Sequence, residues 1–348
     1  MGSKTGSSRR AEVGRLRRRG QTALARFGFD RARLRLLRHE HNTTFRVDAD
    51  GSTFVLRIHR QGVHGPETIS SELAWLRALT IDTDLGVPEP VTALDGSPVV
   101  LVADADGPEP LAAVLFRWQP GRFVDERLMP RHLRQVAELQ AGLQRHAAGW
   151  DRPDGFVRPR VDTLTSGAKR RSLAPSGESG PHPTADDADA CFALVDELLS
   201  RRDTAVVERA LRVVWATTGG LAASPATSGL IHADLHYENF LFHGGRARAI
   251  DFDDCGWGAY LYDLAVTLWE LEARDQYAEL RDALLEGYAQ HLPLPDNHHD
   301  LLNALFLLRR VQMLMWILES RHHAAFADWD QSARAEVRNI GGALRRFD

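Results

Sequence analysis

The sequence has little cysteine, almost no lysine and no long apolar run. Its two cysteines, Cys191 and Cys255, lie far apart and neither has a CxxC partner, which argues against a zinc site or a disulfide framework. So few thiols favour a reducing, cytoplasmic compartment. No apolar run reaches the ~18 residues that a membrane-spanning helix requires, so we expect no membrane segment.

Positive charge is carried almost entirely by arginine, because Lys4 and Lys169 are the two lysines of the chain. The net charge of −4 leaves no basic excess, which argues against a nucleic-acid binder. Arginines are nevertheless concentrated in the first 40 residues. A solvated helix or tail is the simplest interpretation of this arm, and a basic docking arm or targeting peptide remains open.

The length of 348 residues suits two domains, or two lobes around a cleft, better than one compact core. Strand patterns with one helix fill the first third of the chain, and helical patterns fill the rest. The change occurs at the Gln-Pro-Gly sequence of residues 119–121. This order predicts an α+β fold.

Local patterns give the expected elements. The Asp-Gly pair at residues 50–51 predicts a hairpin between strands over 44–48 and 53–58. Residues 1–10 are expected to be disordered, and 11–27 to form a basic helix. The other expected elements are a helix over 69–79, strands over 99–102 and 112–116, a loop over 165–188, and helices over 130–147, 185–200, 203–217, 263–274, 276–291, 299–320 and 331–345.

The strongest chemical signal lies in residues 231–254. In the sequence HADLHYEN, the carboxylate of Asp234 precedes the amide of Asn239 by five residues, between strand-like apolar runs. This spacing matches the H-x-D-x-x-x-x-N catalytic loop of kinases. A second carboxylate, Asp251, follows twelve residues later, beyond a Gly-Gly turn that leaves room for one hairpin. The three side chains are therefore expected to converge.

These residue types suit phosphoryl transfer from ATP. The reaction requires a group that orients and deprotonates the attacking hydroxyl, and oxygen ligands that hold Mg²⁺ on the phosphates. Asp234 can be the base, and Asn239 and Asp251 can be the metal ligands. An isolated HxD sequence is a weak signal because Asp and His often cap turns, but the full set with flanking strands is hard to explain by structure alone.

HADLHYEN followed by IDFDD resembles the aminoglycoside phosphotransferase/choline kinase-like family. That family includes aminoglycoside and macrolide kinases, choline kinases, type II homoserine kinases and a bacterial stress-response protein kinase. The resemblance implies a two-lobed protein-kinase-like fold, with a small β-rich N-lobe over 28–118 and a larger, mainly helical C-lobe over 119–348. A basic arm over 1–27, partly disordered or helical, precedes them.

The resemblance also assigns residues around the catalytic loop. His236 matches the second histidine of the family's loop, and with His232 it is expected to brace that loop. The sequence Asp-Phe-Asp at 251–253 stands where protein kinases have DFG, a departure that is typical of the family.

A nucleotide site is implied upstream. Residues 40–45 lie where the family has a loop that covers the nucleotide, unless they form an ordinary turn. Arg57 occupies the strand position of the kinase phosphate-binding lysine, and Glu72 of the next helix is expected to pair with it; exposed positions are the alternative for both. Backbone groups of a hinge near Trp118 would bind adenine. The candidate phosphate donors in the covering loop are Asn42, Thr43 and Thr44.

The chain after Asp251 is expected to shape the acceptor pocket. Two glycines around Trp257 predict a tight loop, and Asp263 is expected to cap the following helix. Acidic groups near aromatic walls favour a cationic acceptor. The candidate pocket residues are Asp253, Asp254, Trp257, Tyr260, Trp269, Glu270, Trp316 and Glu319.

The sequence therefore predicts a kinase that uses ATP or GTP with Mg²⁺ and phosphorylates a hydroxyl of a small molecule. The acceptors in view are an aminoglycoside or macrolide antibiotic, and an amino alcohol or amino acid such as choline or homoserine. The alternatives are a serine/threonine protein kinase of the stress-response type and a pseudokinase that binds nucleotide without transferring phosphate. The acceptor, the oligomeric state and the role of the arginine-rich arm stay open.

Overall fold

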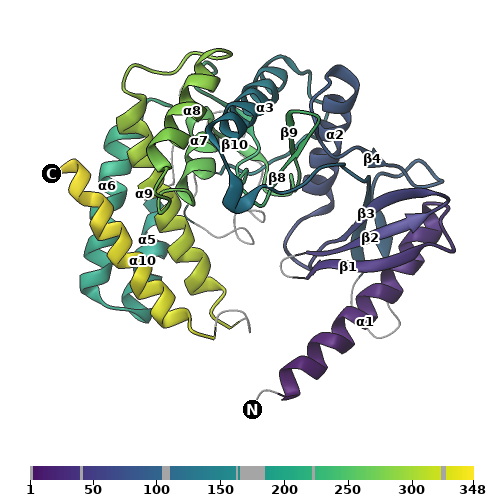
Figure 1. Ribbon diagram of the computed structural model, residues 1–348. Coiled ribbons are helices and arrows are strands. Elements are labelled where there is room, and N and C mark those ends of the chain that lie inside the picture. Colours follow the sequence, from purple (N-terminus) through teal and green to yellow (C-terminus); the bar gives the residue numbers. More distant parts are fainter. Residues whose placement is uncertain are drawn as a thin grey trace. The chain divides into compact units, whose positions relative to one another are not determined.

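The computed structural model describes residues 3–39, 42–103, 110–161, 164, 185–221, 224–322 and 327–348. The chain forms two compact units (Figure 1). Unit 1 comprises Met1–Pro120 and Arg152–Val157, and unit 2 comprises Gly121–Asp151 and Arg158–Asp348. The predicted order of a sheet-rich first part and a helical second part is confirmed. The predicted loop over 165–188 lies largely outside the described residues, as do Glu40 and His41.

Unit 1 is built on an antiparallel sheet in the order β1-β2-β3-β6-β4, with β5 paired to β6. The predicted hairpin is confirmed as β2 and β3, and Asp50 and Gly51 form its turn with φ angles of 50° and 75°. Two strands, β1 and β4, were not predicted: the short alternation of leucine and arginine in β1 adjoins the basic helix, and β4 has two residues, one of them a proline. The strands are β1 (Arg33–His39), β2 (Thr43–Ala49), β3 (Ser52–Ile58), β4 (Pro90–Val91), β5 (Val100–Val102) and β6 (Leu111–Arg117).

Helix α1, Ser3–Arg26, lies against β1. Arg17 Nη1 donates to the Leu34 carbonyl at 2.7 Å, and Gln21 Nε2 donates to the Ala32 carbonyl at 3.1 Å. Arg17 thereby caps a carbonyl of the edge strand β1, and Gln21 one just before it, which hinders pairing with another chain. Near its end, the helix buries Leu24 completely in the core of the sheet.

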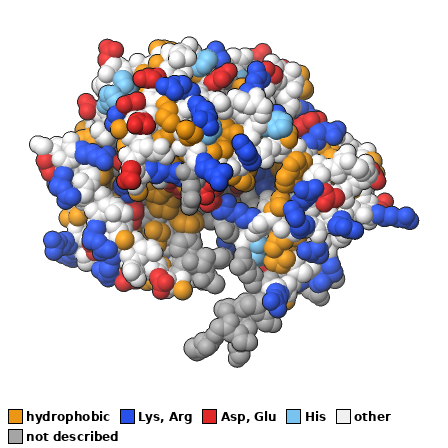
Figure 2. Space-filling model, in the orientation of Figure 1, with side chains coloured by type: hydrophobic (Ala, Val, Ile, Leu, Met, Phe, Trp, Pro, Cys, Tyr) orange, Lys and Arg blue, Asp and Glu red, His pale blue; other side chains and the backbone are white. Residues whose placement is uncertain are grey.

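Helix α1 covers the helix predicted over 11–27 and extends back to Ser3, into the stretch expected to be disordered. A helix held by its packed end propagates along a stretch without proline, because each added residue gains one hydrogen bond. Arginine side chains are visible on the surface of unit 1 in Figure 2, and those of Arg33, Arg35 and Arg38 on β1 are exposed.

Helix α2, Pro66–Asp82, confirms the helix predicted over 69–79. Pro66 opens it, since a proline at the first helical position lacks only an N–H that would have no partner. Its buried face includes Trp75, Leu76 and Leu79, none of them accessible to solvent. This packing fixes the helix beside β3 and brings Glu72 to Arg57.

Unit 2 is mainly helical. The helices predicted from periodicity are present with ends shifted by a few residues; the largest shift is in α7, which begins and ends earlier than the expected 263–274. They are α3 (Pro130–Gly149), α5 (Ala185–Leu198), α6 (Arg201–Thr218), α7 (Tyr260–Trp269), α8 (Tyr277–Ala289), α9 (His298–Glu319) and α10 (Trp329–Leu344). Short 3-10 turns lie at Asp125–Arg127 and Arg345–Phe347.

Among the described residues, one helix is long and apolar enough to cross a membrane, which departs from the expectation of no such run. This helix is α9, and 67% of its apolar window is buried inside the protein. Core helices have this character because they pack against neighbours on most sides. In this structure α9 packs against α6, α7 and α10.

Two short ladders carry the chemical motif. Strand β7 (Ser228–Ile231) pairs with β10 (Gly256–Ala259), and β8 (Phe240–His243) pairs with β9 (Arg246–Ala249). The hairpin expected between Asn239 and Asp251 is therefore confirmed. The tight loop expected around Trp257 was wrong, because this segment is a strand. Its glycines serve close packing: a Cβ at Gly256 would collide with the Pro159 carbonyl, and one at Gly258 with Val161.

Gly256→Ala is expected to lower the free energy of unfolding by about 1–3 kcal/mol, because overpacking forces the neighbouring backbone to shift. Urea unfolding would measure the change. Gly14→Ala is the matched control, since nothing lies within 4 Å of a Cβ at Gly14. Equal unfolding midpoints for Gly256→Ala and the wild type would contradict the packing argument.

Candidate active site

The catalytic motif folds into one loop of unit 2, between β7 and β8. Asn239 Nδ2 donates to the backbone carbonyl of Asp234 at 2.9 Å and to its Oδ2 at 3.2 Å. The backbone carbonyl of Asn239 accepts the N–H of Ile250 at 2.9 Å, and Asp251 is the next residue. The structure therefore brings the predicted base and one predicted metal ligand into contact, and ties the second ligand's strand to the same loop.

Two non-glycine residues of this region have left-handed backbone conformations. Ala233 has a φ of 69° and Asp251 a φ of 64°. Such conformations are unfavourable for residues with a Cβ and persist where the surroundings enforce them, often at functional sites. Here they lie next to Asp234 and at the end of β9.

Asp263 enforces the loop conformation. Its Oδ2 accepts the N–H of His232 at 3.2 Å, and its Oδ1 accepts the N–H of Ala233 at 2.6 Å. The predicted role as a helix cap was wrong, because α7 begins at Tyr260 and Ala259 is its N-cap. The carboxylate instead satisfies two loop amides that would be costly to bury without partners. Burial raises the pKa of Asp263.

His232 joins the loop to the end of β9. Its Nε2 lies 3.1 Å from the Ile250 carbonyl, and its ring lies 4.5 Å from the ring of Phe252 between centroids. The side chain is fully buried, and burial lowers the pKa of His232. A neutral imidazole that is hydrogen-bonded to a backbone carbonyl fits the predicted role of bracing the loop.

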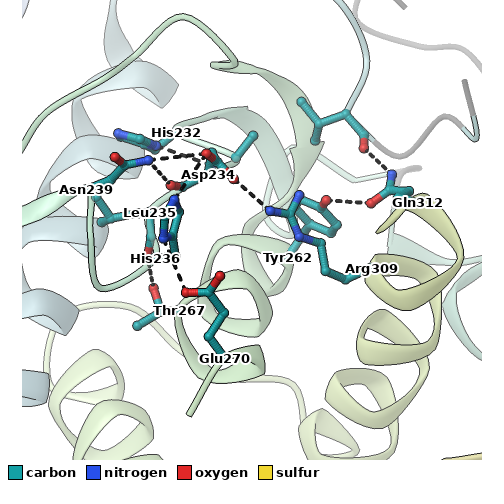
Figure 3. Close-up of polar contacts among 12 residues, drawn as sticks. His232, Asp234, Leu235, His236, Asn239, Tyr262, Thr267, Glu270, Arg309 and Gln312 are labelled. Carbon is teal, nitrogen blue, oxygen red and sulfur yellow. Dashed lines mark hydrogen bonds and ion pairs between the residues drawn. The ribbon is translucent and has the colours of Figure 1, made fainter. Parts of the chain in front are cut away.

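His236 lies between two carboxylates (Figure 3). Its Nδ1 is 3.3 Å from Glu270 Oε2, and its Nε2 is 3.6 Å from Asp234 Oδ2. Burial alone lowers the pKa of His236, but the two carboxylates outweigh it and raise the pKa to about 10. The imidazole is therefore charged at neutral pH. Glu270, predicted as a pocket residue, is directed at this histidine.

His236→Gln is expected to change how stability depends on pH. Because the pKa of His236 is raised from 6.5 to about 10, its stabilising effect is complete below pH 6.5 and is lost as the pH rises toward 10. The variant's deficit in unfolding free energy should therefore be a few kcal/mol at low pH, at about 1.4 kcal/mol per pKa unit, and shrink with rising pH. Urea unfolding across this range tests it.

The matched control is His243→Gln, at an exposed histidine of β8, which should leave the wild-type curve unchanged. A deficit for His236→Gln that stays constant with pH would show that the charge of His236 is not what stabilises the loop.

Arg309, on α9, was missed by sequence reasoning. Its Nη2 donates to Asp234 Oδ1 at 2.7 Å across 75 residues of sequence. Burial raises the pKa of Asp234, but His236 and Arg309 outweigh burial and hold it below its ordinary value. Contacts with Tyr262 and Asp234 likewise outweigh burial and raise the pKa of Arg309. The available signal was a pair of arginines inside an otherwise apolar helix.

A second missed residue supports the segment after Asp251. Arg158 is 2% exposed, and it donates from Nε to the Cys255 carbonyl at 2.5 Å and from Nη2 to the Asp253 carbonyl at 2.6 Å. Asp253 itself is buried. These bonds fix the backbone that follows the predicted metal ligand.

The donor set of the motif fits a magnesium ion. Asn239 uses its Nδ2 on Asp234, so its carbonyl oxygen is the atom left for a cation, and Asp251 supplies a carboxylate. Such hard oxygen ligands suit Mg²⁺, which usually takes one or two protein ligands and completes its shell with phosphates and water. The described part of the chain contains no cluster of three or more His, Cys, Asp or Glu side chains that could hold a metal ion.

Unit 1 contains a buried ion pair at the predicted phosphate-binding position. Arg57 Nη2 lies 2.7 and 2.6 Å from the two carboxylate oxygens of Glu72. The side chains are 4% and 1% exposed, so neither is the exposed residue that the sequence left open. The ring of Phe116 lies 5.1 Å from the guanidinium carbon.

The other predicted nucleotide residues also lie in unit 1. Asn42 Oδ1 accepts the backbone N–H of Arg60 at 3.3 Å, and Thr43 Oγ1 lies 2.8 Å from His39 Nδ1. Thr44 is opposite Arg57 in the β2–β3 ladder. Trp118 follows β6, is 37% exposed and donates its backbone N–H to the Thr53 carbonyl.

The predicted pocket residues lie on several elements of unit 2. Trp269 lies beside the cluster, with its ring centroid 5.8 Å from the guanidinium carbon of Arg309. Trp316 and Glu319 lie roughly 10 and 15 Å further along α9 than Arg309, at about 1.5 Å per residue. Trp257 lies on β10 and Tyr260 at the start of α7, where its hydroxyl donates to the Pro225 carbonyl at 3.4 Å. Asp254 lies between β9 and β10.

Comparisons with known proteins agree with this geometry. Residues 33–301 match the family model described as APH, phosphotransferase enzyme family. The chain is 26% identical over 251 residues to the amicoumacin kinase of Bacillus subtilis (strain 168), and the match covers 72% of this chain and 66% of that protein.

Two solved structures are also similar. A microcompartment-associated aminopropanol kinase gives a TM-score of 0.71 at 31% identity, covering 93% of this chain and 94% of that chain. The amicoumacin kinase hAmiN, in complex with AMP-PNP, Ca²⁺ and Ami, gives a TM-score of 0.69 at 20% identity, covering 88% and 87%. The second likeness supports the fold alone.

Proposed function

Because the chain belongs to the APH phosphotransferase enzyme family, we propose that it transfers the γ-phosphoryl group of a nucleoside triphosphate to a hydroxyl of a small molecule. The observation that carries this proposal is the ionised carboxylate of Asp234, held by Asn239 within the catalytic loop. Kinase relatives named for amicoumacin and aminopropanol support a small-molecule acceptor.

In this proposal, Asp234 orients the acceptor hydroxyl and accepts its proton as the oxygen attacks phosphorus. A carboxylate with a lowered pKa is a weak base, so orientation is its larger contribution. Such a division suits phosphoryl transfer, in which catalysis rests mainly on positioning and electrostatics. Asn239 and Asp251 would hold Mg²⁺, which supplies positive charge to the phosphates when bound.

Arg57 is the proposed phosphate-binding residue of unit 1. Glu72 fixes its guanidinium, and a guanidinium remains charged at any physiological pH. Asn42, Thr43 and Thr44 are proposed to cover the phosphates, with adenine recognised by the backbone near Trp118. Lobes over 28–118 and 119–348 stay part of the same proposal, in which the nucleotide is bound together with a divalent metal.

An amino alcohol is the proposed acceptor class. The aminopropanol kinase is named for an acceptor that carries both an amino group and a hydroxyl, and its likeness covers nearly the whole chain. The buried thiols of Cys191 and Cys255 fit a reducing compartment, which supports a cytoplasmic location.

The test is nucleotide turnover with Mg²⁺ against a panel of acceptors: aminopropanol, choline, homoserine, an aminoglycoside, a macrolide and a protein substrate. Propylamine and propanol are the matched controls, since each lacks one of the two groups of aminopropanol. Phosphorylated aminopropanol is the expected product. Bound nucleotide without transfer to any acceptor would indicate a pseudokinase, and transfer to the protein substrate alone would indicate a protein kinase.

A further inference from the structure

Helix α9 carries two adjacent arginines with separate partners. Arg309 donates to Asp234, the proposed base. Arg310 instead lies 2.7 Å from Glu272 and 3.2 Å from Glu336. The two side chains therefore carry the same charge and lie on the same helix, but they pair with different carboxylates.

Asp234 is held at both carboxylate oxygens, and from different elements (Figure 3). Arg309 Nη2 lies 2.7 Å from Oδ1, whereas Asn239 Nδ2 lies 3.2 Å and His236 Nε2 3.6 Å from Oδ2. Asn239 and His236 belong to the same loop as Asp234, so they move with it. Arg309 is the contact that ties the carboxylate to a core helix.

The carboxylate needs such a tie because the torsion that rotates it has broad minima and does not fix its plane. The side chain of Arg309 can provide it: the side chain is 17% exposed, and its guanidinium carbon lies 5.8 Å from the ring centroid of Trp269. An ionised carboxylate offers about four lone-pair sites. Hydrogen bonds from Arg309 and Asn239 occupy two of these sites, and the charged ring of His236, 3.6 Å from Oδ2, faces a third. About one site is left open to the acceptor hydroxyl.

We propose that Arg309 is a positioning residue, which fixes the carboxylate plane of Asp234 so that the remaining lone pair faces the acceptor hydroxyl. This inference rests on the proposed function. It assigns to Arg309 no contact with substrate, so loss of its side chain acts on the chemical step rather than on binding.

Arg309→Met is therefore expected to lower kcat by about 10- to 100-fold, the range in which a small misplacement of a catalytic group falls. The KM values for nucleotide and for acceptor should change less than about threefold, because Arg309 is proposed to contact neither substrate. Arg309→Lys should recover part of kcat, since lysine restores the charge but not the planar fork.

Arg310→Met is the matched control, with the same charge removed one residue away. It should leave kcat near the wild-type value. Urea unfolding of both variants separates catalytic loss from unfolding. If Arg309→Met fails to fold, Arg309→Lys and the pair Asp234→Asn with Asp234→Asn/Arg309→Lys carry the test: the lysine substitution should lower kcat in the wild type but not in the Asp234→Asn background.

Three results would overturn the inference. The acceptor KM of Arg309→Met could rise at unchanged kcat, which would make Arg309 an acceptor-binding residue. Arg309→Met and Arg310→Met could show equal kcat, or Arg309→Lys could act equally in both backgrounds; either result leaves the proposed function standing. A wild-type enzyme that transfers phosphate to no small acceptor would instead refute the proposed function, and this inference with it.

Discussion

Asp234→Asn is expected to lower kcat by about 10²- to 10⁴-fold, the contribution typical of a positioned acid or base. The amide keeps the shape of the side chain, and its oxygen can still accept from Arg309, but its NH2 group then faces the Asn239 and His236 donors. It lacks the negative charge that orients the hydroxyl and accepts its proton. Nucleotide affinity should change little, since Asp234 is not among the proposed phosphate-binding residues.

Turnover with the acceptor found by the panel, and nucleotide Kd by calorimetry, would measure the two effects. Asp282→Asn removes a carboxylate from an exposed ion pair with Arg281 and serves as the control. An Asp234→Asn enzyme with wild-type kcat would remove the mechanism proposed here. If the variant also fails to bind nucleotide, Asp234 contributes to nucleotide binding rather than to the chemical step alone.

Arg57→Met is expected to lower the free energy of unfolding by about 3–5 kcal/mol, because it leaves the buried carboxylate of Glu72 without its partner. Glu72→Leu should be destabilising to a similar degree for the converse reason. The double substitution Arg57→Met/Glu72→Leu should regain most of the loss, since apolar side chains of similar volume often replace a buried ion pair without cost.

The double variant separates stability from function. If Arg57 binds phosphate, the folded double variant should still show a raised nucleotide KM and little turnover. Urea unfolding and steady-state kinetics on the same samples would decide. Recovery of both stability and turnover would mean that the Arg57–Glu72 pair is structural and that phosphates are bound elsewhere.

Structural features that depend on a short stretch of sequence were predicted correctly. The Asp50-Gly51 turn predicted the first hairpin, and the spacing from Asp234 to Asn239 and Asp251 predicted the loop and the second hairpin. The family and the protein-kinase-like fold that the motif implied are confirmed by the match over residues 33–301 and by the kinase structures. The catalytic and ligand roles of these residues stay predictions.

Features that depend on distant partners were not readable. Asp263 has the sequence context of a helix cap, but its carboxylate reaches His232 and Ala233, about 30 residues away. The glycines beside Trp257 look like turn residues, yet they are required by Pro159 and Val161, residues that only the fold brings near. Arg309 and Arg158 donate hydrogen bonds to residues 75 or more positions away, and the local sequence pattern does not indicate such contacts.

The contact of α1 with the sheet has a practical consequence for anyone who shortens this protein. The family match begins at residue 33, so a boundary drawn from it would discard the whole of α1. That cut would strip Ala23, Leu24 and Phe27 from the core and uncover the Leu34 carbonyl that Arg17 caps on β1. An open edge beside exposed apolar side chains invites aggregation between copies. The arginine-rich arm is thus expected to help keep the sheet of unit 1 from pairing with other copies of the chain.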